Sequence, residues 1–412
     1  MSRVHAGVLI AGGGLAAQRC CETLRRLGFD EPIVVLCAEP CAPYDRPPLS
    51  KGALTGPHEP TRHSFRPAEW YELNDVELVL GVSARELDVR TCTVSLAGKG
   101  APHPRRIGYR RLVVATGSRP RPLQGLPAGG VVHQLRSHDD ALALRASLLD
   151  RRGRLAVLGA GLVGMEVAAA ARAMGLEVTL IEAAATPLER ALPARIGHWI
   201  ADLHREREIE VRLSCTVEDV RLRARGVRLA LSDGSMLEAD TLLVAAGVVP
   251  ATEWLASARG KTGALATDAG GRTGLPCVYA AGDAAAPMLP SGALGGASQH
   301  WEAAARQGAA VARSIMGLAP LEPVPPMFWS DQHGHRMQLV GHAAPDDDVT
   351  FDGDADSGAP FTAWFTRGQI PVGALLFDRP NELPRARRVL ARASLGRCVG
   401  PEPRLPTVPR AA

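Results

Sequence analysis

The alternation of apolar and polar positions predicts two strand–turn–helix units in the chain. In each unit a short apolar run ends in glycines and is followed by apolar residues at helical spacing. The two runs are Gly7–Ala11 and Leu155–Leu158, and the helical patterns extend to Leu27 and Met174. A second apolar run follows each helix, at 33–37 and at 178–181. This order is typical of the βαβ opening of a parallel sheet.

Two later runs repeat the strand-and-glycine part of this pattern. Both are strand-like and end in glycine: Leu112–Gly117 follows the first unit, and Leu242–Gly247 follows the second at a similar distance. This repetition indicates a duplicated plan in which the second unit is inserted into the first. The segment Pro323–Pro326 predicts a linker. Beyond it we expect strands at 337–340, 361–365 and 372–377, a short helix at about 383–393, and a disordered Pro-rich stretch over the last dozen residues.

The predicted fold is therefore α/β, with two Rossmann-like dinucleotide-binding domains and a C-terminal α+β domain. A length of 412 residues suits two or three domains, and 46% apolar residues can fill sizeable cores. We expect a discontinuous first domain at 1–120 and 246–323, a second at 121–245 and a third at 324–412.

Composition excludes several classes of function. A net charge of +4 without a Lys/Arg block does not favour nucleic-acid binding. The apolar runs are strand-sized, far below the roughly 20 residues of a membrane span, and the first strand begins too early for a preceding leader. The eight cysteines include no Cys-x-x-Cys pair, which favours a reduced, cytoplasmic protein. His333 and His335 lack a third metal ligand, so we expect a solvated loop and no metal there.

The glycine turns carry the first functional signal. In a dinucleotide fingerprint the first glycine makes a tight turn, the second admits a pyrophosphate, and the third small residue lets helix and strand pack. The pyrophosphate then meets the N-terminus of the helix. The first set of candidates is Gly12, Gly14, Leu15, Ala16 and Ala17, and the second is Gly159, Gly161, Leu162, Val163 and Gly164.

An acidic residue follows the second strand of each unit. A carboxylate at that place can accept the hydroxyls of a ribose. Glu182 lies 21 residues beyond Gly161, whereas Glu39 is further from its glycines. The residues after Glu182 are alanines, and Arg190 is the nearest basic residue downstream that could receive a 2′-phosphate. The pattern therefore predicts NADH in preference to NADPH.

Several motifs give the chain a resemblance to a known family. The loop Pro-Tyr-Asp-Arg-Pro-Pro-Leu-Ser-Lys at 43–51 resembles the flavin-binding loop of the ferredoxin reductases that serve oxygenases and cytochromes P450. Putidaredoxin reductase and the mitochondrial apoptosis-inducing factor are similar. The resemblance covers nearly the whole chain, and its other motifs lie at 115–120, 247–250, 279–283, 328–332 and 373–375.

The resemblance implies FAD and NADH as cofactors and assigns residues to them. Arg46 and Lys51 would contact the flavin nucleotide, and Asp283 would bond the ribityl chain, with a helix expected to begin after Asp283. Trp301 and Trp329 resemble aromatic residues near the isoalloxazine ring, with core packing as the alternative. The remaining cofactor-binding candidates are Ala115, Thr116, Gly117, Ala246, Gly247 and Gly282.

Lys51 and Glu166 are the catalytic candidates. In the family these positions form an ion pair beside the reactive edge of the flavin, where a fixed cation favours the electron-rich reduced form. A thiol relay is disfavoured because no cysteine occupies the Ser50–Lys51 segment, and Cys41 lies several residues too early.

Three positions and one loop depart from the family pattern. Ala297 and Gln299 replace an arginine and a glutamate, the loop 290–296 is uncharged, and Ala251 replaces an asparagine. These changes concern the docking of ferredoxin more than the cofactors.

The resemblance implies that electrons pass from NADH through FAD to a small iron–sulfur ferredoxin that feeds an oxygenase or a cytochrome P450. The enzyme alternative is an NADH oxidase or a reductase of small acceptors. The other alternative is a redox-sensing binding protein like apoptosis-inducing factor. A monomer or weak dimer is expected.

Overall fold

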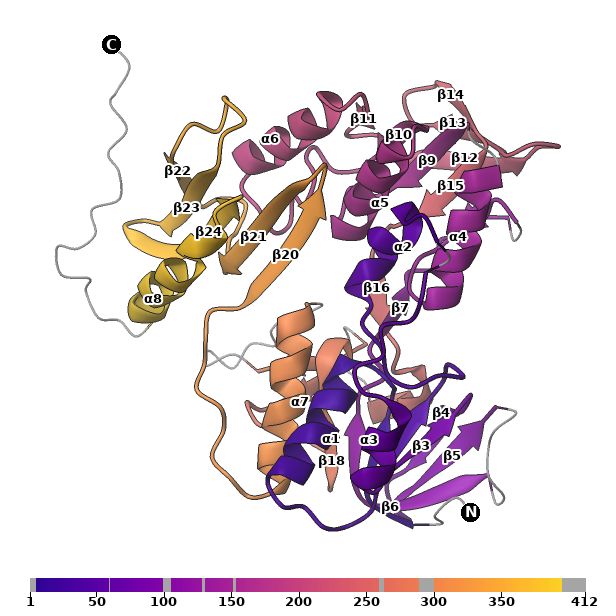
Figure 1. The fold of residues 1–412 in the computed structure, drawn as a ribbon, viewed down its shortest axis with the longest axis vertical. Helices are drawn as coiled ribbons and strands as arrows, with labels where there is room; N and C mark the ends of the chain where they lie inside the picture. Colours follow the sequence, from indigo (N-terminus) through magenta and orange to yellow (C-terminus); the bar gives the residue numbers. More distant parts are fainter. Residues whose placement is uncertain are drawn as a thin grey trace. The chain divides into compact units, whose positions relative to one another are not determined.

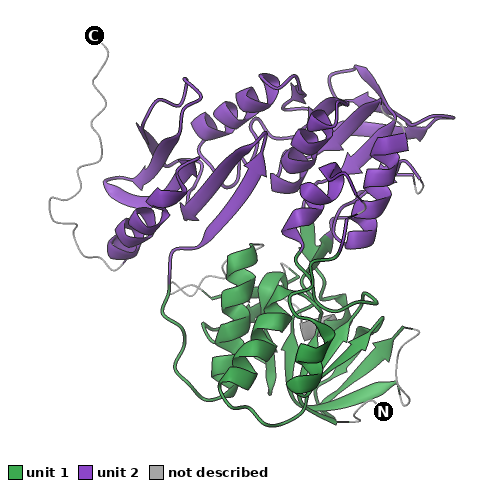
Figure 2. Cartoon of the chain, in the orientation of Figure 1, with its two compact units in different colours: residues 1–45, 62–119, 248–323 green, residues 46–61, 120–247, 324–412 purple. Residues whose placement is uncertain are grey.

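The computed structural model describes residues 5–58, 60–98, 105–127, 130–150, 153–258, 263–288 and 300–394. The chain divides into two compact units, each assembled from three separate segments (Figure 2). Unit 1 comprises 1–45, 62–119 and 248–323, and unit 2 comprises 46–61, 120–247 and 324–412.

Unit 1 is built on one seven-stranded sheet (Figure 1). Its order is β3-β2-β1-β6-β5-β4, and β18 pairs in parallel with β6. The strands are β1 (His5–Ala11), β2 (Ile33–Cys37), β3 (Val76–Leu80), β4 (Ser83–Asp88), β5 (Thr93–Ala97), β6 (Arg106–Val114) and β18 (Val278–Ala280). Strand β1 is buried from Ala6 to Ala11, as expected of a central parallel strand covered on both faces.

Helices α1 (Leu15–Arg26), α3 (Ala68–Leu73) and α7 (Trp301–Ile315) also belong to unit 1. Helices α1 and α7 lie side by side (Figure 1). Their backbones approach closely at Gly308 of α7, where a Cβ atom would overlap the carbonyl oxygen of Ala16. The shorter elements of this part of the chain are β7 (Ser118–Pro120), β16 (Val248–Pro250), η2 (Glu253–Ala258), β17 (Leu265–Thr267), η3 (Gly282–Ala284) and β19 (Ala285–Pro287).

Unit 2 contains an all-parallel sheet of order β11-β10-β9-β15-β8, whereas the sheet of unit 1 is mixed, since β4, β5 and β6 pair antiparallel. Its strands are β8 (Val132–His133), β9 (Arg154–Leu158), β10 (Glu177–Ile181), β11 (Glu210–Arg212) and β15 (Thr241–Val244). A three-stranded antiparallel sheet follows, with β12 (Val217–Leu222), β13 (Val227–Leu231) and β14 (Met236–Ala239). The helical elements of this part are η1 (Pro47–Ser50), α2 (Gly52–Thr55), α4 (His138–Asp150), α5 (Leu162–Ala173) and α6 (Ala194–Arg205).

The C-terminal part of unit 2 is an antiparallel sheet of order β20-β21-β24-β23-β22. Its elements are β20 (Met327–Gln332), β21 (His335–Gly341), β22 (Asp348–Asp352), β23 (Phe361–Arg367), β24 (Ile370–Phe377), η4 (Pro380–Glu382) and α8 (Leu383–Ser394). Phe361 and Phe377 stack inside it, and Trp199 of α6 meets both rings edge-on. The expected α/β fold, with two Rossmann-like parts and a C-terminal α+β part, is confirmed.

One expected element is wrong. Asp283 lies in the short turn η3, and β19 follows it in place of a helix. Ala285 and Ala286 pair with β17, and Pro287 favours an extended conformation in the residue before it. The Pro-rich last dozen residues lie outside the described part of the chain, as do Ala297, Gln299 and the loop 290–296.

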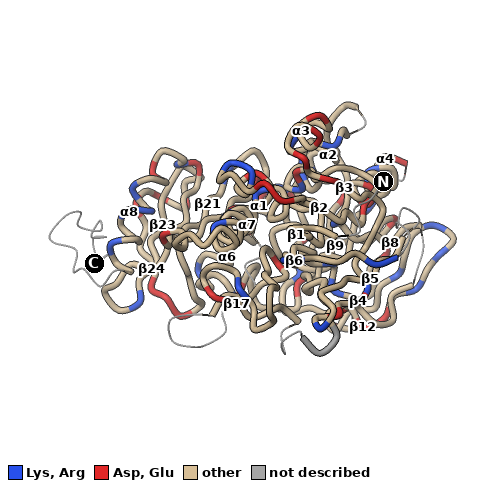
Figure 3. Tube along the Cα trace, turned by 90° about the horizontal axis from the view of Figure 1, so that it is seen from below, with Lys and Arg blue, Asp and Glu red and all other residues tan. Residues whose placement is uncertain are grey.

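Lys/Arg and Asp/Glu residues are interspersed along the trace (Figure 3). Within the described ranges no helix combines the length and the hydropathy that a membrane crossing requires. In the same ranges no three His, Cys, Asp or Glu side chains gather in a way that could hold a metal ion.

The close approach of α1 and α7 predicts that Gly308→Ala destabilises unit 1. Alanine normally stabilises a helix interior by about 1 kcal/mol relative to glycine. Here the new methyl group would force the two helices apart, so we expect the free energy of unfolding to fall by about 1–3 kcal/mol. Urea unfolding followed by circular dichroism measures this. Gly274→Ala is the control, because a Cβ at this exposed glycine meets nothing within 4 Å. Equal or higher stability of Gly308→Ala would contradict the close packing.

Candidate cofactor and catalytic sites

The first glycine turn lies at the carboxyl end of β1, in unit 1. Gly12 has φ +123°, and a Cβ there would overlap the carbonyl oxygen of Ala115. Gly14 precedes α1, and an ideal Cβ on it meets nothing within 4 Å. The first turn of α1 has no acidic residue, and its N–H groups have no intrahelical acceptor. The turn therefore offers open space and free donors to an anionic group.

The second glycine turn, in unit 2, repeats this geometry at the end of β9. Gly159 has φ +104°, and its Cβ would overlap the carbonyl oxygen of Ala245. Gly161 is open in the same way as Gly14. Gly164 lies so close to Gly159 that only a glycine fits, which is the tight packing of helix on turn that the sequence predicts. Leu162 and Val163 begin α5, with no acidic residue in its first turn.

The two acidic candidates lie after their strands. Glu182 directly follows β10, and its half-buried carboxylate binds the second glycine turn through Oε2, which accepts the N–H of Ala160 at 2.6 Å, while Oε1 accepts the N–H of Ala184 at 2.9 Å. Glu39 accepts a hydrogen bond from the Tyr44 hydroxyl at 2.6 Å. Arg190 is exposed in the turns between β10 and α6.

Polar groups near the first turn suit a flavin nucleotide. The Ser118 hydroxyl donates to Asp283 Oδ2 at 2.5 Å, and the N–H of Gly282 donates to Gln307 at 2.7 Å. Among the described residues Thr116 Oγ1 is buried without a hydrogen-bond partner. A buried hydroxyl without a partner, beside a glycine cradle, fits a bound group that would complete it.

Trp301, at the start of α7, donates its indole N–H to Asp45 Oδ1 at 2.7 Å within unit 1. Trp329 is half-buried on β20, opposite Gln338 of β21. Arg46 donates to the carbonyl of Arg136 at 2.7 Å, and the segment 46–61 that contains it packs within unit 2.

Lys51 and Glu166 form an ion pair in unit 2, with Lys51 Nζ 2.8 Å from Glu166 Oε1. Lys51 lies between η1 and α2, and Glu166 lies in α5 with 6% of its surface exposed. The Ser50 hydroxyl donates to Glu166 Oε2 and the Ser330 hydroxyl donates to Oε1, the latter at 2.6 Å. Three donors thus surround this carboxylate, which is the condition under which a buried charge is tolerated.

Two histidines extend this polar cluster. Gln332 links Ser330 to His204 of α6, which is fully buried, and His333 Nε2 lies 3.1 Å from His204 Nδ1. Burial lowers the pKa of His204 to about 4, and burial with nearby His204, Arg207 and His335 lowers the pKa of His333 to about 3. His333 lies in a turn as expected, but it is half-buried against His204 and so is only partly solvated. His333 (φ +54°) and Gly334 (φ +82°) form the two-residue turn between β20 and β21.

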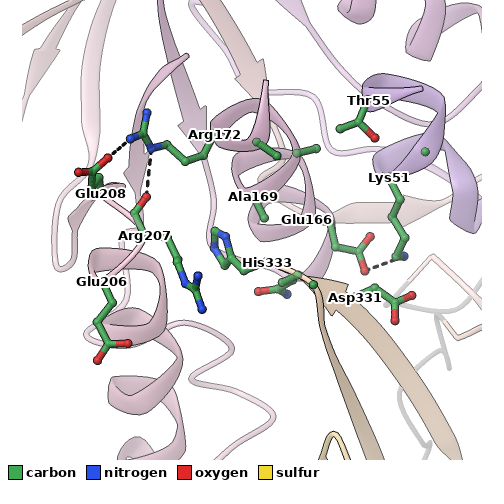
Figure 4. A pocket seen from close by; sticks show the side chains of 15 residues that line it. Lys51, Thr55, Glu166, Ala169, Arg172, Glu206, Arg207, Glu208, Asp331 and His333 are labelled. Carbon is green, nitrogen blue, oxygen red and sulfur yellow. Dashed lines mark hydrogen bonds and ion pairs between the residues drawn. The ribbon is translucent and has the colours of Figure 1, made fainter. Parts of the chain in front are cut away.

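A pocket of about 590 Å³ within unit 2 contains Lys51 and Glu166 in its lining (Figure 4). Arg172, paired with Glu208, lies at the other end of the view, and His333 lies between these two pairs.

The buried cysteines are poor candidates for a thiol relay. Burial raises the pKa of Cys20 and of Cys37 to about 12, and the pKa of Cys21 is also raised by burial. These thiols stay protonated near neutral pH, whereas the thiolate is the reactive form.

The pyridine nucleotide-disulphide oxidoreductase model matches residues 6–308, and a reductase C-terminal model matches 327–397. The chain belongs to this oxidoreductase family.

Similar proteins of the family share nearly the whole chain. The ferredoxin–NAD(+) reductase component of the anthranilate 1,2-dioxygenase system of Burkholderia cepacia is 36% identical over 391 residues, which covers 94% of each protein. The ferredoxin reductase of the CYP199A2 system of Rhodopseudomonas palustris has a solved structure that superposes with a TM-score of 0.87 at 30% identity, covering 97% of this chain and 96% of that one. Putidaredoxin reductase, solved as a covalent complex with putidaredoxin, gives a TM-score of 0.86 at 27% identity, covering 95% and 93%.

Sequence reasoning missed several polar residues at these sites. Ser50, Ser118 and Ser330 lie inside motifs that the sequence analysis quotes, but no spacing rule singles out their hydroxyls. Gln307 and His204 lie on helices where their residue types carry no signal, since only packing brings them to Gly282 and Gln332.

The low pKa of His204 predicts an acid-dependent loss of stability. The unfolded chain takes up a proton near pH 6.5 and the folded chain only near pH 4, so protons favour the unfolded state as the pH falls between these values. One such group costs on the order of 3 kcal/mol across this window. We expect the free energy of unfolding to fall less between pH 7 and pH 4 in His204→Gln than in the wild type, as measured by urea titration. The control is His198→Gln, an exposed histidine of the same helix, which should keep the wild-type slope.

Proposed function

We propose that the chain is the NADH-dependent, FAD-containing reductase of an oxygenase or cytochrome P450 system, and that its electron acceptor is a small iron–sulfur ferredoxin. The observation that carries this proposal is the pair of glycine turns, one in each unit, each open at its second glycine and adjoining a helix N-terminus. Relatives that match over 94% of the chain include a ferredoxin–NAD(+) reductase component, which supports the assignment.

The first turn would hold FAD. Gly12, Gly14, Leu15, Ala16 and Ala17 would receive its pyrophosphate, and Glu39 its ribose. The other residues that we assign to FAD are Arg46, Lys51, Ala115, Thr116, Gly117, Gly282, Asp283, Trp301 and Trp329. The buried Thr116 hydroxyl and the Asp283 carboxylate are suited to polar atoms of such a group.

The second turn would hold NADH. Gly159, Gly161, Leu162, Val163 and Gly164 would receive its pyrophosphate, Glu182 its ribose, and Ala246 and Gly247 would contact it from the end of β15. On this assignment the FAD domain is 1–120 with 246–323, the NAD domain is 121–245 and the C-terminal domain is 324–412.

FAD, when bound, takes up two electrons as hydride from NADH and releases electrons singly to a one-electron acceptor. The Lys51–Glu166 pair would supply a fixed positive charge, held by a buried carboxylate, that favours the electron-rich reduced state. The buried thiols of Cys20 and Cys37 stay protonated, which makes these two cysteines unsuited to a step in that electron transfer, and we place the protein in a reducing compartment such as the cytoplasm.

The proposal predicts that NADH and a cognate iron–sulfur ferredoxin reduce cytochrome c far faster than NADH alone. The FAD-loaded protein would be assayed with ferredoxins of its own source and, in parallel, with oxygen and with a quinone. Ferredoxin should be the fastest acceptor. If oxygen or the quinone outcompetes every ferredoxin, the chain is an oxidase or a small-acceptor reductase.

The contacts of Glu182 predict a preference for NADH over NADPH. A 2′-phosphate would place a like charge beside the carboxylate, and Ala183, Ala184 and Ala185 offer no cation. We expect kcat/KM to favour NADH by at least about tenfold, equal to about 1.4 kcal/mol, and Glu182→Ala to narrow the gap.

Glu189→Ala is the matched control, because Glu189 is exposed and accepts the N–H of Ala185 in the same segment. It should leave the preference unchanged. Equal kcat/KM values of the wild type for NADH and NADPH would show that Glu182 does not distinguish the ribose hydroxyl from the 2′-phosphate.

A further inference from the structure

A continuous line of hydrogen bonds leads from Glu166 into the C-terminal sheet. Ser330 Oγ lies 2.6 Å from Glu166 Oε1, and Gln332 Nε2 lies 2.9 Å from Ser330 Oγ. His204 Nε2 lies 2.9 Å from Gln332 Oε1, and His333 Nε2 lies 3.1 Å from His204 Nδ1. Four side chains from a strand, a helix and a hairpin turn therefore join in series behind one carboxylate.

The charge of Glu166 fixes the direction of every bond in this line. An ionised carboxylate only accepts, so the Ser330 hydroxyl must donate to it. Ser330 then accepts from the amide NH₂ of Gln332, which turns Gln332 Oε1 toward His204. His204 must therefore carry its proton on Nε2, which leaves Nδ1 as an acceptor for the Nε2–H of His333. His204 is neutral in this arrangement because its Nδ1 must accept, and the lowered pKa of His333 makes that ring neutral as well.

The line is dry along most of its length. Ser330, Gln332 and His204 are 2%, 1% and 0% exposed. Ser330 and Gln332 are two residues apart on β20 and so face the same side of the strand, toward α5. For stability alone, apolar side chains could fill this face of β20, since replacing both partners of a buried hydrogen bond by apolar groups changes the free energy of unfolding little. The polar side chains are therefore explained by the Glu166 carboxylate, with which they are hydrogen-bonded in series.

Glu166 Oε1 accepts from both Ser330 and Lys51, whereas Oε2 accepts from Ser50. The serines thus hold the carboxylate at both oxygens, and the carboxylate holds the Lys51 ammonium. Any rotation of Glu166 would move the position of the positive charge.

We propose that Ser330, Gln332, His204 and His333 form a positioning chain, which orients Glu166 and through it the Lys51 ammonium for hydride transfer. This inference rests on the proposed function for the step that it assists, but the orientation itself is a property of unit 2. His333, at the outer end of the positioning chain, lines the same pocket as Lys51 and Glu166 (Figure 4).

The first test reads the positioning chain without turnover. In the FAD-loaded protein with ¹⁵N-labelled histidine, NMR should show both His204 and His333 as neutral Nε2–H tautomers from pH 8 to pH 5. The two resonance sets are assigned with His204→Gln and His333→Gln. An Nδ1–H tautomer at either position, or a charged His204 ring, at pH 7 would overturn the proposal, because the hydrogen bond between the two rings would then be reversed or lost.

The second test measures flavin reduction by NADH in a stopped-flow instrument. Ser330→Ala removes one oxygen atom and His204→Phe removes a donor, so both should lower the limiting rate by about tenfold while the Kd of NADH stays within about twofold. His204→Gln should restore the rate to within about threefold of the wild type, because its amide can still donate to Gln332. His198→Gln, an exposed change on the same helix, should match the wild type.

If His204→Phe does not fold, Ser330→Ala carries the test. Wild-type rates in a folded, FAD-loaded Ser330→Ala would overturn the positioning role while the proposed function stands. If NADH does not reduce even the wild-type flavin, the proposed function is wrong, and so is the role of the positioning chain in hydride transfer. The tautomer experiment would still decide whether the positioning chain orients Glu166.

Discussion

The structure depends on the close approach of two glycine turns to the strand beside each of them. Gly12 meets the Ala115 carbonyl and Gly159 meets the Ala245 carbonyl at separations that admit no side chain. Each approach brings a helix N-terminus to the carboxyl ends of neighbouring parallel strands, where free N–H groups can meet an anion. The duplicated turns are therefore the two places at which we propose that the dinucleotides bind.

Glu166 is the second constraint, since a carboxylate with so little exposure needs compensation from all sides. Lys51, Ser50 and Ser330 provide it from three different parts of unit 2. The segment 46–61, α5 and β20 must therefore meet with these polar groups in register, which apolar packing alone would not require. The C-terminal sheet thus contributes a polar strand face as well as a core built on Phe361 and Phe377.

The polar line behind Glu166 also has a consequence for acid stability. His204 keeps both of its hydrogen bonds only while it is neutral, because its Nε2 donates to Gln332 and its Nδ1 accepts from His333. The low pKa values of the two histidines follow from the burial that makes the line rigid. Stability toward acid and orientation of the ion pair are therefore two results of the same packing.

The sequence alone determined the elements whose signal is local. The apolar runs, the glycine spacings and the acidic residue after β10 predicted both dinucleotide turns, because strand periodicity and positive φ depend on neighbouring residues. Strands β21, β23 and β24 were predicted for the same reason, whereas β20 and β22 were not predicted as strands. The prediction of a helix after Asp283 was wrong, because this segment pairs with β17 as a strand and that pairing outweighed its local pattern. Only the tertiary structure joined Ser330 to Glu166 and His204 to Gln332, because residues 164 and 128 positions apart along the chain meet through packing that no periodicity records.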